Sequence, residues 1–146
     1  MAKYYQGKYK PKYPEKYKGN PSTITYRSSW ELNCMTYFDK NPDIIWWASE
    51  ELVIPYRSPI DGRKHRYFID FLIKTSNKEV VAIEVKPEAQ TRPPKAQKKL
   101  TKKYLTEVQT WGVNQAKWKA AEEYCLDRGW KFTIVTEKQL FGKKPK

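Results

Sequence analysis

The chain has 146 residues, and 29 lysines and arginines against 16 acidic residues give it a formal net charge of +13. This length suits one domain with its own core, and the charge indicates a polyanionic partner, with nucleic acid as the first candidate. A membrane partner is not favoured, because we find no signal peptide, no basic amphipathic helix with an aromatic face and no apolar run of about 20 residues. Cys34 and Cys125 form no Cys-x-x-Cys pair and, with one histidine in the chain, provide no structural zinc site; they are typical of reduced core residues in a cytosolic protein.

Residues 1–21 differ from the rest of the chain, because Lys, Tyr, Pro and Gly dominate them and Leu, Ile and Val are absent. Such a segment cannot form a core of its own. It is either a flexible or extended arm laid over the domain, or a DNA-binding arm with lysines on phosphates and tyrosines stacked on bases. We expect a domain over residues 22–141 that folds without this arm, followed by a basic tail over residues 142–146.

Residues 25–40 are predicted to form the first helix, with Ser28 as its N-cap and Asn41-Pro42 at its end. Its apolar stripe at helical spacing consists of Trp30, Cys34, Tyr37 and Phe38. Glu31 follows Ser28 by three residues, which is the capping-box pattern, and this alone accounts for it. Because Glu31 also borders the core-facing stripe, its carboxylate could instead point toward the sheet.

The next segment, residues 44–50, is interpreted as an aromatic connection, and a strand is expected over about residues 51–56. Asp61-Gly62 is a strong hairpin turn, and a further strand is expected over about residues 64–75. His65 lies among Arg63, Lys64 and Arg66. This basic group is either a solvated strand edge or a contact with the DNA backbone.

Two apolar runs between residues 67 and 86, separated by the polar residues 76–78, predict an antiparallel hairpin with charges inside its strands. Asp70 interrupts the first run, and Glu84 and Lys86 share one face of the second. Acidic residues are poor strand formers and are seldom buried without a partner. These side chains form either a buried ion-pair network or a site in which two carboxylates hold a divalent cation beside a lysine.

Residues 95–110 are predicted to form a basic helix, and Gly112 is expected to separate it from a second helix over residues 115–128. Five lysines of the basic helix are either solvated or in contact with the DNA backbone: Lys95, Lys98, Lys99, Lys102 and Lys103. Asn114 is the expected cap of the second helix and Gly129 its end. A last strand over residues 130–136 would pair in parallel with the preceding one through a right-handed crossover. The expected α/β fold is a mixed central sheet flanked by helices, in the order α-β-β-β-α-β.

This order and these charges resemble the PD-(D/E)XK nuclease superfamily, whose restriction-endonuclease-like core has an Asp on one strand and (D/E)-x-K on the next. Asp70 and Glu84-Val85-Lys86 match this pattern, with Ile69 where the superfamily name has Pro, and Glu31 fits the acidic residue of the first helix. Over about residues 20–138, segments such as Y-R-S-S-W-E, S-E-E-L-V-I-P-Y and H-R-Y-F-I-D-F are similar to TnsA-type transposon-end nucleases and to head completion nucleases of large tailed phages.

The resemblance implies a Mg²⁺ ion, with Mn²⁺ as a substitute, held by Asp70, Glu84, the backbone carbonyl of Val85 and, directly or through water, Glu31. Lys86 would orient or deprotonate the attacking water or stabilise the phosphate. Additional contacts with phosphates are expected from residues outside this group: Gln115, Lys117 and Arg66.

The implied function is Mg²⁺-dependent hydrolysis of double-stranded DNA, by an endonuclease or exonuclease that processes packaged DNA before the phage head joins its tail. Portal or neck proteins would be its partners, in the host cytoplasm or on the virion. Two alternatives are a non-enzymatic head–neck protein that holds DNA or plugs the portal, and a TnsA-like transposition or repair endonuclease. Because basic residues are spread over the chain, we expect DNA binding with little sequence specificity and strong salt dependence.

Overall fold

The computed structural model describes residues 6–141, so the expected basic tail lies outside the described residues. The elements in chain order are β1 (Gly7–Lys8), η1 (Pro14–Lys16), β2 (Thr25–Tyr26), α1 (Ser29–Lys40), β3 (Ile44–Ser49), β4 (Val53–Arg57), β5 (Lys64–Phe68), β6 (Phe71–Thr75), β7 (Val80–Val85), η2 (Glu88–Thr91), α2 (Lys102–Asp127), β8 (Lys131–Val135) and α3 (Glu137–Phe141). Within this part of the chain, no helix is long and apolar enough to cross a bilayer.

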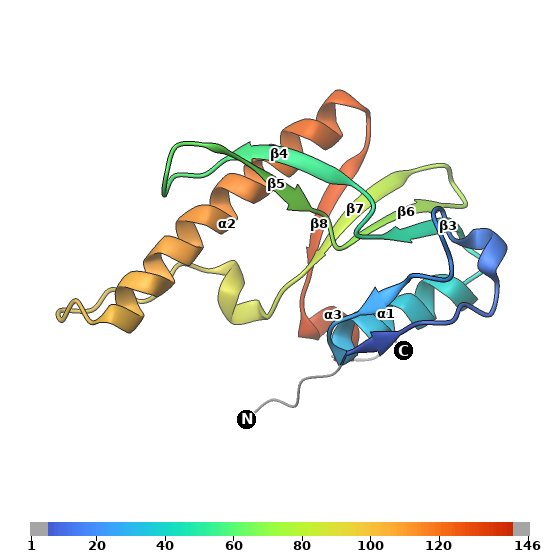
Figure 1. Cartoon of the computed structure of the whole chain (residues 1–146), viewed down its shortest axis with the longest axis horizontal. Helices are drawn as coiled ribbons and strands as arrows, with labels where there is room; N and C mark the ends of the chain where they lie inside the picture. The colour runs from blue at the N-terminus through green and yellow to red at the C-terminus, as the bar shows by residue number, and fades with distance from the viewer. Residues whose placement is uncertain (1–5, 142–146) are drawn as a thin grey trace.

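The central sheet has the strand order β3-β6-β7-β8. Its first three strands are antiparallel, whereas β7 and β8 are parallel and joined through α2. The predicted mixed sheet and parallel last pair are therefore confirmed. Helices cover both faces of this sheet (Figure 1). Successive strand residues point to opposite faces, so Ile83 packs in the cluster that contains residues of α1, and Ala82 packs in the cluster that contains residues of α2.

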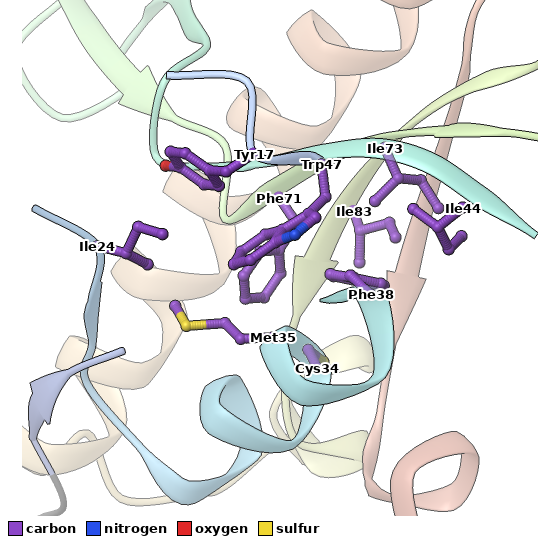
Figure 2. Packing of buried hydrophobic residues seen from close by; sticks show 10 residues of the cluster. All are labelled: Tyr17, Ile24, Cys34, Met35, Phe38, Ile44, Trp47, Phe71, Ile73 and Ile83. Atoms are coloured by element: carbon purple, nitrogen blue, oxygen red, sulfur yellow. The ribbon is translucent and has the colours of Figure 1, made fainter. Parts of the chain in front are cut away.

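Residues 44–49 form the strand β3, so the prediction of an aromatic connection is wrong. Trp47 is fully buried and lies at the centre of the cluster between α1 and the sheet, against Phe38 and Phe71 (Figure 2). Trp46, its neighbour on the opposite face, is only partly buried. Because the two tryptophans are adjacent, this segment lacks the alternation of apolar and polar residues that predicts a strand.

The predicted strand over residues 64–75 is two strands, β5 and β6, because the long antiparallel hairpin to which they belong bends in its middle. The last pair between β3 and β6 is Ser49–Phe71, and the first pair between β4 and β5 is Val53–Phe68. Between these pairs, the three residues 50–52 of one side lie opposite the two residues 69–70 of the other. This is a bulge, which bends a strand and redirects its side chains. Beyond the bend, β4 and β5 form a separate two-stranded ribbon.

The helix α2 is continuous from Lys102 to Asp127, so the prediction of two helices divided at Gly112 is wrong. Glycine lowers helix stability by about 1 kcal/mol relative to alanine but keeps its backbone hydrogen bond, so burial of the apolar face of α2 outweighs it. Asn114 is buried within the helix and caps nothing. The N-cap is Thr101, whose Oγ1 accepts a hydrogen bond from the N–H of Tyr104 at 3.1 Å.

Gly112→Ala should raise the free energy of unfolding by about 0.5–1 kcal/mol. An added Cβ would meet only Pro59, 3.9 Å from its Cγ, which is an ordinary van der Waals contact. Gly129→Ala is the matched control and should destabilise the protein, since Gly129 has φ +73° where α2 ends. Urea denaturation measures both changes, and destabilisation by Gly112→Ala would contradict the prediction.

Residues 6–21 of the N-terminal arm lie over the domain and complete its core. Tyr17 is only 6 % exposed, and its ring packs edge-on against Trp47 with 4.8 Å between centroids. Tyr9 contacts the same indole at 5.9 Å. Because Trp47 would lose this cover without the arm, we expect the domain to be less stable without it; folding of the domain without residues 1–21 stays a prediction.

Polar contacts attach the arm to the end of α1. Asp39, fully buried, accepts hydrogen bonds from the Tyr9 hydroxyl at 2.9 Å and from the N–H groups of Lys12 and Tyr13 at 2.6 and 3.1 Å. The ammonium of Lys16 donates to three backbone carbonyls where α1 ends, those of residues 38, 39 and 41. A cation at this position also complements the negative end of the helix dipole.

Candidate active site

The bend in the hairpin places Asp70 beside the end of β7. Asp70 Oδ2 accepts a hydrogen bond from the N–H of Val85 at 2.8 Å. In turn, the Asp70 carbonyl accepts from the N–H of Glu50 at 3.1 Å across the bulge. Asp70 and the Glu84-Val85-Lys86 segment therefore meet, as the sequence predicted from their neighbouring strands.

Glu84 is buried on the face of the sheet that α2 covers, with 6 % of its surface exposed. Its Oε1 accepts a hydrogen bond from the Tyr67 hydroxyl at 2.7 Å, and its Oε2 lies 3.8 Å from the ammonium of Lys86. Burial raises the pKa of Glu84, while the hydrogen bond from Tyr67 and the charges of Lys86 and Lys117 oppose this rise. The hydrogen bond from Tyr67 and the ammonium of Lys86 hold the carboxylate from two sides.

Lys117, half-buried on α2, faces the same carboxylate from the helix side. Its ammonium lies 5.4 Å from the ring centroid of Tyr67 and 5.9 Å from that of Tyr56. Cation–π contacts of this kind fix a lysine that would otherwise be mobile. Two lysines, Lys86 and Lys117, therefore add positive charge around Glu84.

Glu31 caps α1 and also lies beside the bend; its role as a ligand stays a prediction. Its N–H donates to Ser28 Oγ at 3.1 Å and its Oε1 accepts from the N–H of Arg27 at 2.8 Å, which caps α1. The side chain is also half-buried beside the bend, and burial raises its pKa, as does the charge of Glu50. Glu31 is therefore a helix cap that borders the carboxylate group.

Glu50 is a site residue that sequence reasoning missed. It lies in the bulge with φ 57°, in the left-handed region that non-glycine residues rarely adopt. The Arg27 guanidinium binds it with two hydrogen bonds of 3.0 Å. One carboxylate oxygen from each of Glu31, Glu50 and Asp70 lies within 4.8 Å of the others, so the three can hold a metal ion. The only signal in the sequence is the acidic pair at positions 50 and 51.

Mutual repulsion among these carboxylates favours a bound cation. Burial raises the pKa of Asp70 well above its usual value, and the charges of Glu84 and Glu31 raise it further. A divalent ion would remove this repulsion, and a donor set of carboxylate oxygens suits Mg²⁺ better than a softer metal. The donor set therefore fits the metal that the resemblance implies; the roles of Glu84 and the Val85 carbonyl as ligands stay predictions.

The structure does not bring all the expected DNA-binding residues together. Lys95, Lys98 and Lys99 lie in the loop before α2, because the helix begins later than predicted, at Lys102. Lys102 and Lys103 form the first turn of α2, about 22 Å along the helix axis from Lys117. Gln115 is exposed on α2, and Arg66 is exposed on β5. DNA contact by each of these residues stays a prediction.

The chain belongs to the family of the TnsA-like endonuclease N-terminal domain, whose model matches residues 41–137. This match contains Glu50, Asp70, Glu84 and Lys86, while Glu31 precedes it. The chain is also 46 % identical over 140 residues to the head completion nuclease of Enterobacteria phage T4, a match that covers 93 % of each protein. The resemblance expected from the sequence is thus confirmed.

Proposed function

We propose that this chain is a Mg²⁺-dependent DNA nuclease that acts in phage head completion, processing packaged DNA before the head joins the tail. The observation that carries the proposal is the meeting of Glu31, Glu50 and Asp70 at the bend, beside Glu84 and Lys86. Membership of an endonuclease family and the name of the phage T4 relative support it. We further propose portal or neck proteins as its partners, in the host cytoplasm or on the virion.

The arrangement of elements supports a PD-(D/E)XK core. When the β4–β5 ribbon is treated as an extension of the bent hairpin, α1, β3, β6, β7, α2 and β8 follow the order α-β-β-β-α-β. Asp70 then precedes the second of these core strands, and Glu84 and Lys86 lie at the end of the third.

The carboxylates of Asp70, Glu31 and Glu50 would hold the ion, together with Glu84 and the Val85 carbonyl. When bound, Mg²⁺ acidifies a coordinated water and stabilises negative charge on phosphate oxygens. Tyr67 keeps Glu84 in place through the hydroxyl hydrogen bond, and this leaves the Lys86 ammonium beside the free side of Glu84. From there, Lys86 can orient the attacking water or stabilise charge on the phosphate.

A non-enzymatic protein that only holds DNA is less consistent with this site. Clustered carboxylates repel both one another and the phosphates of DNA, so a passive DNA-binding surface would gain nothing from them. A transposition or repair endonuclease would share the site but not the phage role that the name of the T4 relative suggests.

Incubation with supercoiled plasmid and with linear duplex, each with Mg²⁺, with Mn²⁺ and with EDTA, tests the proposal. We expect the metals to support cleavage and EDTA to prevent it. Conversion of the plasmid to nicked or linear forms identifies an endonuclease, whereas loss of the linear substrate alone identifies an exonuclease. Intact DNA under every condition, with protein that is folded and binds the duplex, would favour the passive DNA-holding alternative.

A further inference from the structure

The β4–β5 ribbon has two faces of different chemistry. Its inner face, with Ile54, Tyr56 and Tyr67, packs toward α2. Its outer face consists of the cross-strand pairs Val53–Phe68, Pro55–Arg66 and Arg57–Lys64. Among the elements of residues 6–141, only α2 packs extensively against the ribbon (Figure 1), so the outer face is open.

The outer face is positively charged without local compensation. Arg57, Lys64 and Arg66 are all exposed, and within residues 6–141 none of them forms an ion pair with a carboxylate. The one acidic residue of the ribbon, Asp61, lies at the turn and binds the His65 ring at 2.9 Å. Three uncompensated cations on a two-stranded surface are suited to a polyanion.

Two of these cations are held in place. The Arg66 guanidinium lies over the ring of Phe68, 5.5 Å from its centroid, and Arg57 donates a hydrogen bond to the carbonyl of Gly62. Phe68 is 45 % exposed, so the surface combines an open aromatic ring with fixed guanidinium groups. Aromatic rings and arginines together contact the sugars and bases of nucleic acid as well as its phosphates.

The ribbon is also connected to the candidate active site. Phe68 precedes Asp70 by two residues, and Tyr67, on the inner face of the same strand, donates to Glu84. At about 3.3 Å per strand residue, Lys64 lies no more than about 20 Å from Asp70. That length corresponds to about six base pairs of duplex at 3.4 Å each. DNA in contact with the outer face would therefore lie within about six base pairs of the carboxylates.

We propose that the outer face of the β4–β5 ribbon binds the backbone of duplex DNA beside the cleavage position, through Arg57, Lys64 and Arg66. The inference rests on the proposed function in that DNA is the substrate. The major groove of B-DNA admits a two-stranded β-ribbon, so the dimensions of this element are compatible with such contact. Phe68 would provide an apolar contact next to the phosphate-binding cations.

The test is the salt dependence of binding to a short duplex, measured by fluorescence anisotropy in EDTA, where cleavage plays no part. The ribbon variant combines Arg57→Gln, Lys64→Gln and Arg66→Gln. The control variant combines Lys40→Gln, Lys78→Gln and Lys131→Gln, which removes the same charge from exposed positions at the end of α1, at the β6–β7 turn and at the start of β8. Circular dichroism establishes that both variants are folded.

Each phosphate contact contributes about −0.9 to the slope of log affinity against log salt. We expect the ribbon variant to lose about 2 to 3 from the magnitude of this slope and at least tenfold in affinity at low salt, with the control variant close to wild type. Equal losses in both variants would indicate a general charge effect and overturn the proposal. Wild-type binding by the ribbon variant would also overturn it and would assign the face to a protein partner. Ribbon-dependent binding by a chain that cleaves nothing would refute the nuclease function alone.

Discussion

Asp70→Asn should abolish metal-dependent cleavage while leaving the protein folded and at least as stable in metal-free buffer. The amide oxygen can still accept the hydrogen bond from Val85, so local structure is retained. The substitution removes a charge that burial and Glu84 both disfavour. Sites that carry such strain often become more stable when a functional residue is replaced. Loss of the charge should also weaken the proposed metal site.

Melting temperatures in EDTA and in Mg²⁺ separate this expectation from a purely structural role. Wild type should melt higher in Mg²⁺, because binding to the native state stabilises it, whereas Asp70→Asn and Glu50→Gln should respond less. If the carboxylates formed only an ion-pair network, breaking it would cost about 3–5 kcal/mol in EDTA. Glu79→Gln, at an exposed ion pair with Lys131, is the control and should leave cleavage unchanged. A variant at Asp70 that cleaves normally would refute the assignment.

The same measurements of cleavage and melting temperature apply to variants of Glu84 and Lys86. Glu84→Gln keeps an oxygen for the Tyr67 hydroxyl, so its fold should persist while cleavage is lost. Lys86→Ala should lose cleavage and keep the rise in melting temperature with Mg²⁺, since an ammonium does not bind the cation. These two variants therefore divide metal binding from the chemical step.

The sequence identified Asp70, Glu84 and Lys86 because each interrupts an apolar strand, which is a local signal. Glu50 could not be found in this way. Its position in the site depends on a bulge and a left-handed φ of 57°, and both arise where the long hairpin bends over the core. Pairing register and bulges are set by contacts distant in sequence. Glu50 could therefore be assigned to the carboxylate group only from the three-dimensional structure.

The errors at α2 have a different physical origin. Gly112 and Asn114 carry local preferences against a helix interior of about 1 kcal/mol or less each. Burial of a side chain as large as Trp118 stabilises by more than this, and the helix continues through both positions. The predicted parallel pairing of β7 and β8 was independent of where the helix began, because any crossover helix between two such strands gives it.

The composition of the N-terminal arm did not predict its contribution to the core. A segment without Leu, Ile or Val indicated a dispensable addition, but its tyrosines supply the apolar surface instead. Tyr9 and Tyr17 contact Trp47, and Asp39 satisfies two N–H groups of the arm from within α1. Aromatic rings bury as much surface as aliphatic side chains do. These contacts favour a folding unit that includes the arm.

Deletion of residues 1–18 should therefore destabilise the domain by about 3–5 kcal/mol or more, the cost of removing one large buried aromatic side chain such as Tyr17. Because many domains are stable by only about 5–15 kcal/mol, the truncated chain should melt far below wild type. Asp39→Ala should have part of this effect, about 1–3 kcal/mol, since two partly buried N–H groups and the Tyr9 hydroxyl lose their acceptor.

Urea denaturation of the deletion, of Asp39→Ala and of Glu15→Ala measures these losses, with the exposed Glu15 as the control inside the same segment. Tryptophan fluorescence should shift toward that of an exposed indole in the deletion variant, because the cover of Trp47 by Tyr9 and Tyr17 is removed. If the truncated protein instead unfolds at the wild-type urea concentration, the arm contributes nothing to the core. A loss of DNA retention without a loss of stability would then make the arm a binding element, with its lysines on phosphates.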